Sequence, residues 1–181
     1  MSDCEECGFT YDEVDAAGAP AAIRAFGRRY RAPLTRFLPG EDGDALVRTR
    51  PAPETWSALE YAAHVRDVFA NYDRWVHQVL ADDGCVLTGP GPDEQAADGR
   101  YNEDDPVAVA DAVAANAERL AATFESVPDD GWDRSGTRRR ADFEQERSVL
   151  LHARLAVHEG NHHLLDIGRG LRAVRERSKQ A

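Results

Sequence analysis

The sequence of 181 residues contains few lysines, methionines and cysteines. Lys179 is the only lysine beside 21 arginines, one methionine is present, and the cysteines are Cys4, Cys7 and Cys85. Three cysteines cannot all pair within one chain, which fits a reducing compartment and excludes a disulfide-built scaffold. We attribute the arginine bias to G+C-rich coding DNA and not to function.

Long apolar runs and excess positive charge are also missing. No run of apolar residues is long enough to span a bilayer, and residues 1–6 are too polar and acidic for a signal peptide. The net charge of −11 argues against nucleic acid or an anionic membrane as the main partner. We therefore expect a cytoplasmic monomer or homodimer whose partners are small molecules.

Strand-like alternation is rare, whereas helical periodicity is frequent. Apolar residues recur at helical spacing in four segments, at about 20–38, 57–81, 106–127 and 148–168. The second segment opens with a capping box, Ser57 to Glu60. We predict an all-α four-helix bundle over residues 17–172, preceded by an extension at residues 1–16 and followed by a polar, frayed tail at residues 173–181.

Two polar connections separate the predicted helices. Residues 84–104 form a long Gly/Pro-rich connection between the second and third helices, and a connection of this length could cover a site. Residues 129–146 are charged and turn-rich and contain Arg138-Arg139-Arg140. The simpler interpretation is that these arginines are a solvated charge run, and the alternative is that they bind an anionic ligand.

Four of the six histidines lie in the fourth predicted helix. His158 and His162 are four residues apart on an apolar seam with Leu151, Leu155 and Leu165, so both rings can hold one metal ion. A hydrogen-bonded core pair is the simpler alternative.

The second predicted helix offers a third imidazole. His64 lies near its start, and facing helices of a bundle bring side chains together in the core. We predict one divalent metal held by His64, His158 and His162, with an open position as in catalytic sites. Zinc is favoured, and nickel, iron and copper are compatible with these ligands.

The extension carries a separate signal, Cys4-Glu5-Glu6-Cys7-Gly8. This pattern is similar to half of a zinc knuckle, but a closed site needs four ligands. A possible second metal at Cys4 and Cys7 would need Cys85 and a histidine, and the candidates are His77, His152 and His163. Two ordinary thiols, or a redox-active dithiol, are the alternatives.

Two stretches resemble the signatures of the DinB-like superfamily. They are WSALEYAAHVRDV at 56–68 and HEGNHHLLDI at 158–167, while YNEDDP at 101–106 resembles the branch found in mycothiol-using bacteria. The resemblance extends over residues 20 to 172. It implies a four-helix bundle with a three-histidine metal site, which maps here onto His64, His158 and His162.

The resemblance also suggests a reaction. Characterised members of the superfamily include metal-dependent thiol S-transferases and the mycothiol-dependent maleylpyruvate isomerase. We expect no counterpart of the separate C-terminal domain of that isomerase, and we therefore expect thiol transfer and not isomerisation. A low-molecular-weight thiol of the mycothiol type would be the co-substrate, because metal coordination deprotonates a thiol whose unperturbed pKa is about 8.5.

In this hypothesis a small electrophile binds under the 84–104 connection. Arg66 or the arginines at 138–140 would orient its anionic group, and Glu159 would support the metal ligands from behind.

Two other functions fit parts of the sequence. Residues 158–162 read H-E-x-x-H, the pattern of zinc peptidases in which Glu159 would be the general base. The sheet that shapes a peptide cleft is missing from the predicted elements, and this class does not use an upstream histidine such as His64. A metal- or ligand-binding stress module without turnover is the non-enzymatic alternative.

Overall fold

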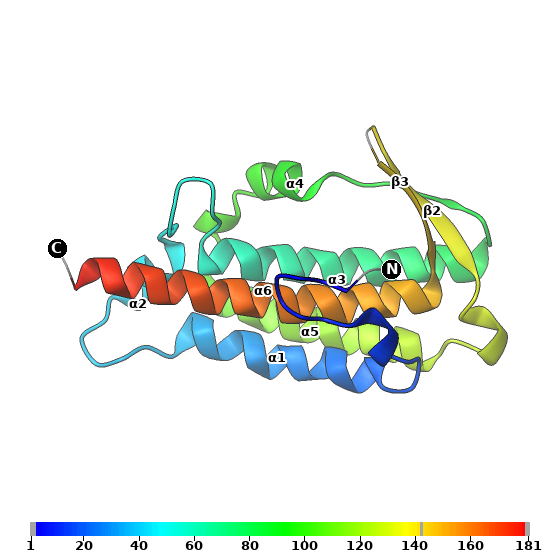
Figure 1. Cartoon of the computed structure of the whole chain (residues 1–181), viewed down its shortest axis with the longest axis horizontal. Helices are drawn as coiled ribbons and strands as arrows, with labels where there is room; N and C mark the ends of the chain where they lie inside the picture. The colour runs from blue at the N-terminus through cyan, green and yellow to red at the C-terminus, as the bar shows by residue number, and fades with distance from the viewer. Residues whose placement is uncertain (1–2, 142, 180–181) are drawn as a thin grey trace.

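The computed structural model describes residues 3–141 and 143–179, and four long helices form its body (Figure 1). These helices are α1 (Ala19–Thr35), α3 (Ala58–Ala81), α5 (Pro106–Glu125) and α6 (Val149–Ser178). The predicted four-helix bundle is confirmed. Parts of the predicted extension and tail, residues 1–2 and 180–181, lie outside the described residues.

The four helices are arranged so that α1 and α3 each pack against both α5 and α6. Contacts between α1 and α3 are few, so these two lie diagonally across the bundle. Side-chain caps fix three of the helix starts. Ser57 and Glu60 form the predicted capping box of α3, while Asp105 and Ser148 accept backbone N–H groups at the starts of α5 and α6.

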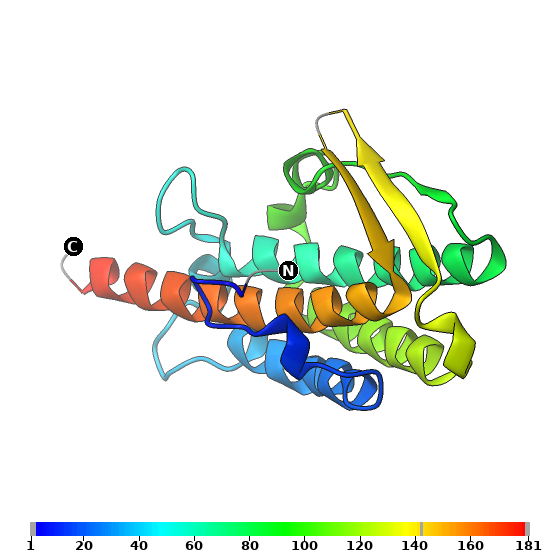
Figure 2. The same cartoon turned by 45° about the vertical axis from the view of Figure 1, so that its right-hand side comes forward.

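A small sheet lies beside the bundle, on the same side as the short helix α4 (Pro92–Asp98) (Figure 2). Its strands are β1 (Val86–Leu87), β2 (Ser135–Arg140) and β3 (Phe143–Ser148), with β1 parallel and β3 antiparallel to β2. The short elements are η1 (Tyr11–Glu13), α2 (Gly43–Arg48), α4 (Pro92–Asp98), η2 (Tyr101–Glu103) and η3 (Asp129–Gly131). None of the described helices combines the length and apolar character needed to cross a membrane.

The sheet corrects the prediction for two connections. Residues 129–146 were expected to be turn-rich, but β2 and β3 pair as a hairpin at 135–140 and 143–148. The 84–104 connection contains β1, α4 and η2. Strands β2 and β3 are polar on both faces, so neither shows apolar alternation. Their backbone pairing and the packing of long side chains hold them in place.

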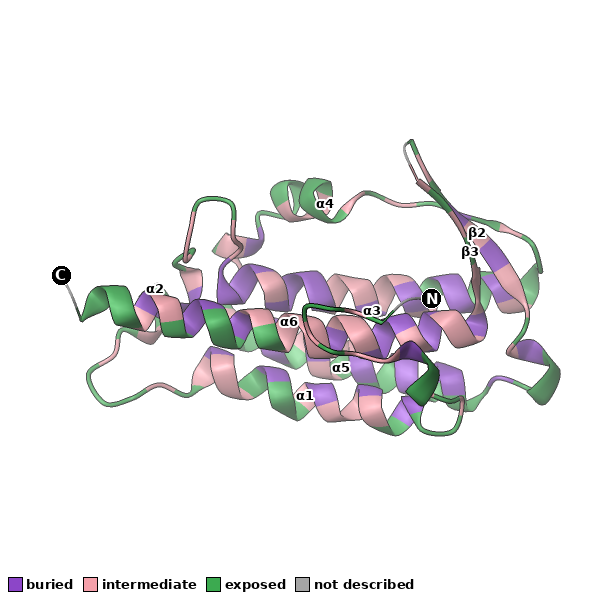
Figure 3. Ribbon diagram, in the orientation of Figure 1, coloured by how far each residue is buried: buried purple, intermediate pink, exposed green. Residues whose placement is uncertain are grey.

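The core of the bundle is filled from all four long helices (Figure 3). The ring of Phe26 lies 6.2 Å from Tyr30 and 5.9 Å from Phe69, measured between centroids. The Tyr30 hydroxyl donates to the carbonyl oxygen of Gly160 at 2.9 Å, and this glycine allows α6 to approach the Phe26 ring.

The buried face of α6 differs from the predicted seam. Its buried residues are Val149, His152, Ala153, Leu155, Ala156, Val157, Gly160, Ile167, Gly170, Leu171 and Val174, so Leu155 is the one leucine of the predicted seam among them. Leu165, predicted on the seam, is 37% exposed. Ala153, Ala156 and Gly160 occupy the middle of the buried face, so the leucine spacing marked a face rotated away from it. The helix also continues through Ser178, where a frayed tail was expected, and Arg175 pairs with Glu41 at 2.7 Å.

Candidate functional site

Helix α6 presents possible metal ligands on two adjacent faces. His158 and His162 lie one turn apart on one face, and Glu159 and His163 lie on the next face, rotated by about 100°. Three groups of candidate ligands result: the first cluster is His64, Glu159 and His163, the second cluster is Cys4, Cys7, His158 and His162, and a third group, His162, His163 and Asp166, overlaps both. Within each cluster the candidate ligand atoms lie within 4.8 Å of one another.

The structure groups these residues differently from the predicted triad. His64 joins Glu159 and His163, whereas His158 and His162 gather with the N-terminal cysteines. The physical reason is the orientation of α6: its inward face is rotated relative to the leucine seam. His158 therefore packs against Tyr11 of the N-terminal segment, with ring centroids 5.2 Å apart.

The first cluster has distances that suit a metal ion. The Glu159 Oε2 atom lies 3.5 Å from His64 Nε2 and 3.2 Å from His163 Nε2. Nitrogen and oxygen ligands at the usual zinc distances are about 3.4 Å apart in a tetrahedral site. The other ring nitrogen of His163, Nδ1, lies 2.9 Å from Asp166 Oδ2, which is the carboxylate support that metal-binding histidines commonly have.

The electrostatics of this cluster favour a cation. Burial would raise the pKa of Glu159, but hydrogen bonds from His163 and His64 hold it well below its usual range. Burial alone would lower the pKa of His163, yet its bonds to Asp166 and Glu159 raise it to about 9. A buried carboxylate is thus balanced by protonated imidazole, and a metal ion could replace that proton.

A pocket of about 190 Å³ opens beside His64 and Glu159. Its other lining residues are Val68, Asn71, Tyr72, Trp75, Pro90, Pro92, Gln95, Arg138, Arg140, Phe143 and Arg147. The lining therefore combines two candidate ligands, aromatic rings and three guanidinium groups.

The three guanidinium groups concentrate positive charge in this pocket. Arg138 lies 4.7 Å from the centroid of the Trp75 ring, and its pKa is lowered by burial and by the neighbouring Arg140 and Arg147. Arg140 and Arg147 lie 5.2 and 5.7 Å from the centroid of the Phe143 ring. The pocket is thus suited to an anionic group.

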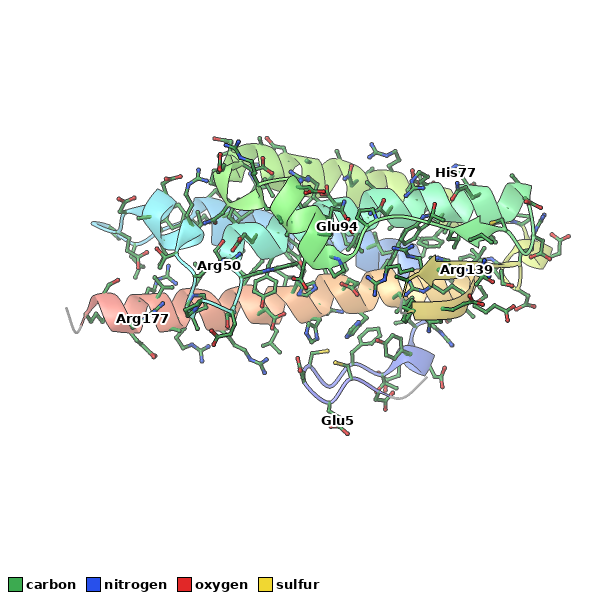
Figure 4. All side chains as sticks on the ribbon, turned by 90° about the horizontal axis from the view of Figure 1, so that it is seen from above. Glu5, Arg50, His77, Glu94, Arg139 and Arg177 are labelled. Carbon is green, nitrogen blue, oxygen red and sulfur yellow. The ribbon has the colours of Figure 1, made fainter. Side chains whose placement is uncertain are left out.

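Only part of the predicted arginine run belongs to the pocket. Arg138 and Arg140 line it, whereas Arg139, labelled in Figure 4, pairs with Glu144 at 2.7 Å on the exposed side of the hairpin. Arg147 also lines the pocket and was not predicted from the sequence. Alternation along two strands would have placed Arg138, Arg140 and Arg147 together, had the hairpin been recognised.

Arg66 has contacts of its own, away from the pocket lining. Its guanidinium lies 2.7 Å from Asp67 and 2.6 Å from Asp104, and it covers the Tyr101 ring. These contacts hold the end of the 84–104 connection against α3, so they support a structural role for Arg66.

The partners expected for Cys4 and Cys7 also differ from those in the structure. Cys85 precedes β1, His77 is exposed on α3, and His152 is buried at the start of α6. His158 and His162 lie beside the two cysteines instead. In the H-E-x-x-H interpretation Glu159 would serve a metal at His158 and His162, but its carboxylate contacts the first cluster.

Comparison with solved structures identifies two similar folds. "YfiT from Bacillus subtilis", described as "a probable metal-dependent hydrolase with an unusual four-helix bundle topology", superposes with a TM-score of 0.78 at 12% identity, covering 95% of this chain and 92% of that one. The mycothiol-dependent maleylpyruvate isomerase gives a TM-score of 0.66 at 15% identity, covering 88% of this chain and 63% of that one. At these identities the likeness concerns the fold alone.

No curated protein matches the sequence. Residues 23–167, however, match the sequence model of the DinB superfamily, which is well over half of the chain. The chain belongs to the DinB superfamily.

Proposed function

We propose that this protein is a metal-dependent enzyme that acts on a small anionic molecule, with the metal held by His64, Glu159 and His163. One observation carries the proposal: the three side chains converge, and two of them, His64 and Glu159, line a pocket that three arginines also line. Three protein ligands leave a coordination position for a substrate, as is usual in catalytic sites. Zinc suits this ligand set, and nickel, iron and copper are compatible with it.

When bound, a divalent cation here would supply Lewis acidity and lower the pKa of a coordinated thiol or water. The chain's own residues position the reactants. Arg140 and Arg147 bind the anionic group, while Arg138 holds the 87–90 segment at the pocket by donating to its carbonyl oxygens. Asp166 fixes the ring of His163.

Aromatic rings pack around the two histidines of this site. Trp56 lies 5.3 Å from the His64 ring, and Tyr61 stacks on His163 with centroids 5.2 Å apart. These half-buried rings cover part of the cluster, and partial removal from water strengthens the electrostatic interactions within it.

Thiol S-transfer is the reaction that we infer for this site. The superfamily signatures support it, as does the similarity of the fold to the mycothiol-dependent isomerase. A low-molecular-weight thiol of the mycothiol type would be the co-substrate, and the electrophile would lie beside the arginines. Hydrolysis is the second candidate, supported by the fold likeness to YfiT.

The test is an activity panel on the metal-loaded protein. Anionic model electrophiles are incubated with mycothiol, cysteine or glutathione, and separately with water alone. We expect thiol conjugation that is lost in His163→Ala and retained in His77→Ala, a change at an exposed histidine of α3. Turnover without thiol would favour hydrolysis, and stable metal binding with neither reaction would indicate a binding module.

A further inference from the structure

The second cluster on α6 has ligands of a different kind. We propose that Cys4, Cys7, His158 and His162 form a closed zinc site that fastens the N-terminal segment to the bundle. This inference is independent of the proposed function, because the two clusters share no ligand.

The backbone around the cysteines forms a tight turn. The Cys4 N–H donates to the Phe9 carbonyl at 3.0 Å, and the Gly8 N–H donates to the Cys4 carbonyl at 2.8 Å. Gly8 has φ +70°, a left-handed conformation that favours glycine. The turn brings both sulfur atoms toward α6, while Glu5 lies on the outer side of the loop in Figure 4.

The distance between Cys4 and His162 matches a shared metal ion. Their Sγ and Nδ1 atoms are 3.6 Å apart. With zinc–sulfur bonds of about 2.3 Å and zinc–nitrogen bonds of about 2.0–2.1 Å, tetrahedral geometry places these atoms about 3.6 Å apart. The other ring nitrogen, Nε2, faces Glu6 at 3.4 Å and Asp166 at 3.5 Å. Carboxylate support on Nε2 leaves Nδ1 for the metal.

His158 provides a second, independent observation. Both of its ring nitrogens are buried and have no hydrogen-bond partner within the described part of the chain. The rings of Phe9 and Tyr11 pack on it, with centroids 5.3 and 5.2 Å away. An unpaired polar group in such surroundings is costly. A bond to zinc would satisfy this imidazole, whereas a simple dithiol or a Cys4–Cys7 disulfide would leave it unpaired.

The charge and number of the ligands indicate a structural site. Two thiolates and two neutral imidazoles compensate Zn²⁺ completely, which suits a partly buried position. Four protein ligands leave no position for a substrate. The site would clamp the N-terminal segment next to the first cluster, because His158 and His162 alternate along α6 with Glu159 and His163.

Cobalt substitution tests this site directly. The reduced, metal-free protein is loaded with Co²⁺, and we expect thiolate-to-cobalt charge-transfer bands in the near ultraviolet together with the visible bands of a tetrahedral centre. The first cluster contains no sulfur, so the charge-transfer bands would be seen even if the first cluster bound no metal. Cys7→Ser should abolish these bands and lower the metal content by one ion per chain, and Cys85→Ser is the matched control that should retain both.

A second measurement needs no variant and so does not depend on mutant folding. In the zinc-loaded protein we expect Cys4 and Cys7 to resist alkylation, and chelation should expose them, as followed by peptide mass spectrometry. The proposal is wrong if the charge-transfer bands are absent, if alkylation of the two thiols is unaffected by zinc, or if the zinc-loaded protein contains a Cys4–Cys7 disulfide.

Discussion

Asp166 contacts both candidate metal centres through one oxygen atom. Its Oδ2 lies 2.9 Å from His163 Nδ1 and 3.5 Å from His162 Nε2. Carboxylates in this position orient the imidazole and raise its basicity as a ligand. A single residue therefore supports ligands of two sites that point in different directions from α6.

We expect Asp166→Asn to weaken metal binding at both sites, by about 10–100-fold at each. Competition with a chromophoric chelator measures the two affinities, and the exposed Asp129→Asn serves as the control. A variant with unchanged affinities would show that the histidines are oriented by packing alone.

His152 makes stability depend on pH without belonging to either cluster. It is fully buried against Tyr72 and Trp75, and burial lowers its pKa to about 4 from the ordinary 6.5. Because the pKa of His152 is lower in the folded chain, the unfolded chain binds more protons between pH 6.5 and 4. The stability of the fold therefore decreases as the pH is lowered through that window. The loss should reach about 3 kcal/mol at pH 4.

This effect is measured by urea unfolding of the wild type and of His152→Asn at a series of pH values. A chelator is present throughout, so that release of metal at low pH does not contribute to the difference. The variant should have the flatter pH profile. Parallel profiles would mean that other groups cause the pH dependence.

Arg147 is expected to act in substrate binding. Arg147→Gln removes one of the three pocket guanidinium groups, so KM for anionic electrophiles should rise about 10-fold or more while kcat changes little. Neutral electrophiles should be unaffected. Arg139→Gln, on the exposed side of the same hairpin, is the control, and an equal effect of both changes would point to long-range charge instead of contact.

At the scale of elements, the glycines of α6 separate a packing role from intrinsic helix propensity. A Cβ atom at Gly160 would overlap the Phe26 ring, whereas one at Gly168 would meet no atom within 4 Å. We expect Gly160→Ala to destabilise the protein by about 1–3 kcal/mol. Gly168→Ala should stabilise it by about 0.5–1 kcal/mol. Chemical unfolding of both variants checks the signs, and a stable Gly160→Ala protein would show that α6 can shift away from α1.

Helices with strong local signals could be predicted from the sequence, and elements held by long-range contacts could not. The capping box at Ser57 and the proline at Pro106 marked the starts of α3 and α5. The hairpin of β2 and β3 was not predicted, because its residues are polar on both faces and its stability comes from backbone pairing between the strands. The orientation of α6 was missed because small residues, among them Gly160, occupy the middle of its buried face.

At the scale of the whole molecule, the position of α6 decides the composition of both clusters. One of its faces meets α3, which carries His64, and the adjacent face meets the N-terminal segment, which lies alongside the helix in Figure 1. The sequence pointed to residues that take part in the two clusters, including the two cysteines and His64. It could not indicate how they are grouped, because the grouping depends on which helices are neighbours and on how each is rotated.

The bundle should remain folded when its metals are removed. Its buried core extends along all four long helices, so metal binding adds to a structure that apolar burial already supports. At free metal 100 times above Kd, each site adds about 2.7 kcal/mol. That corresponds to a Tm increase of roughly 5–11 °C for a chain of this length. Chelation should therefore lower Tm while the helical circular dichroism at 25 °C is retained.

A Cys4→Ser/Cys7→Ser double variant separates the contributions of the two sites to this change. The decrease in Tm on chelation should be about half that of the wild type, because only the site at His64, Glu159 and His163 would still bind metal. Loss of the helical signal at 25 °C would mean that the bundle requires metal to fold, as zinc fingers do. An unchanged Tm in the wild type would contradict metal binding at both sites.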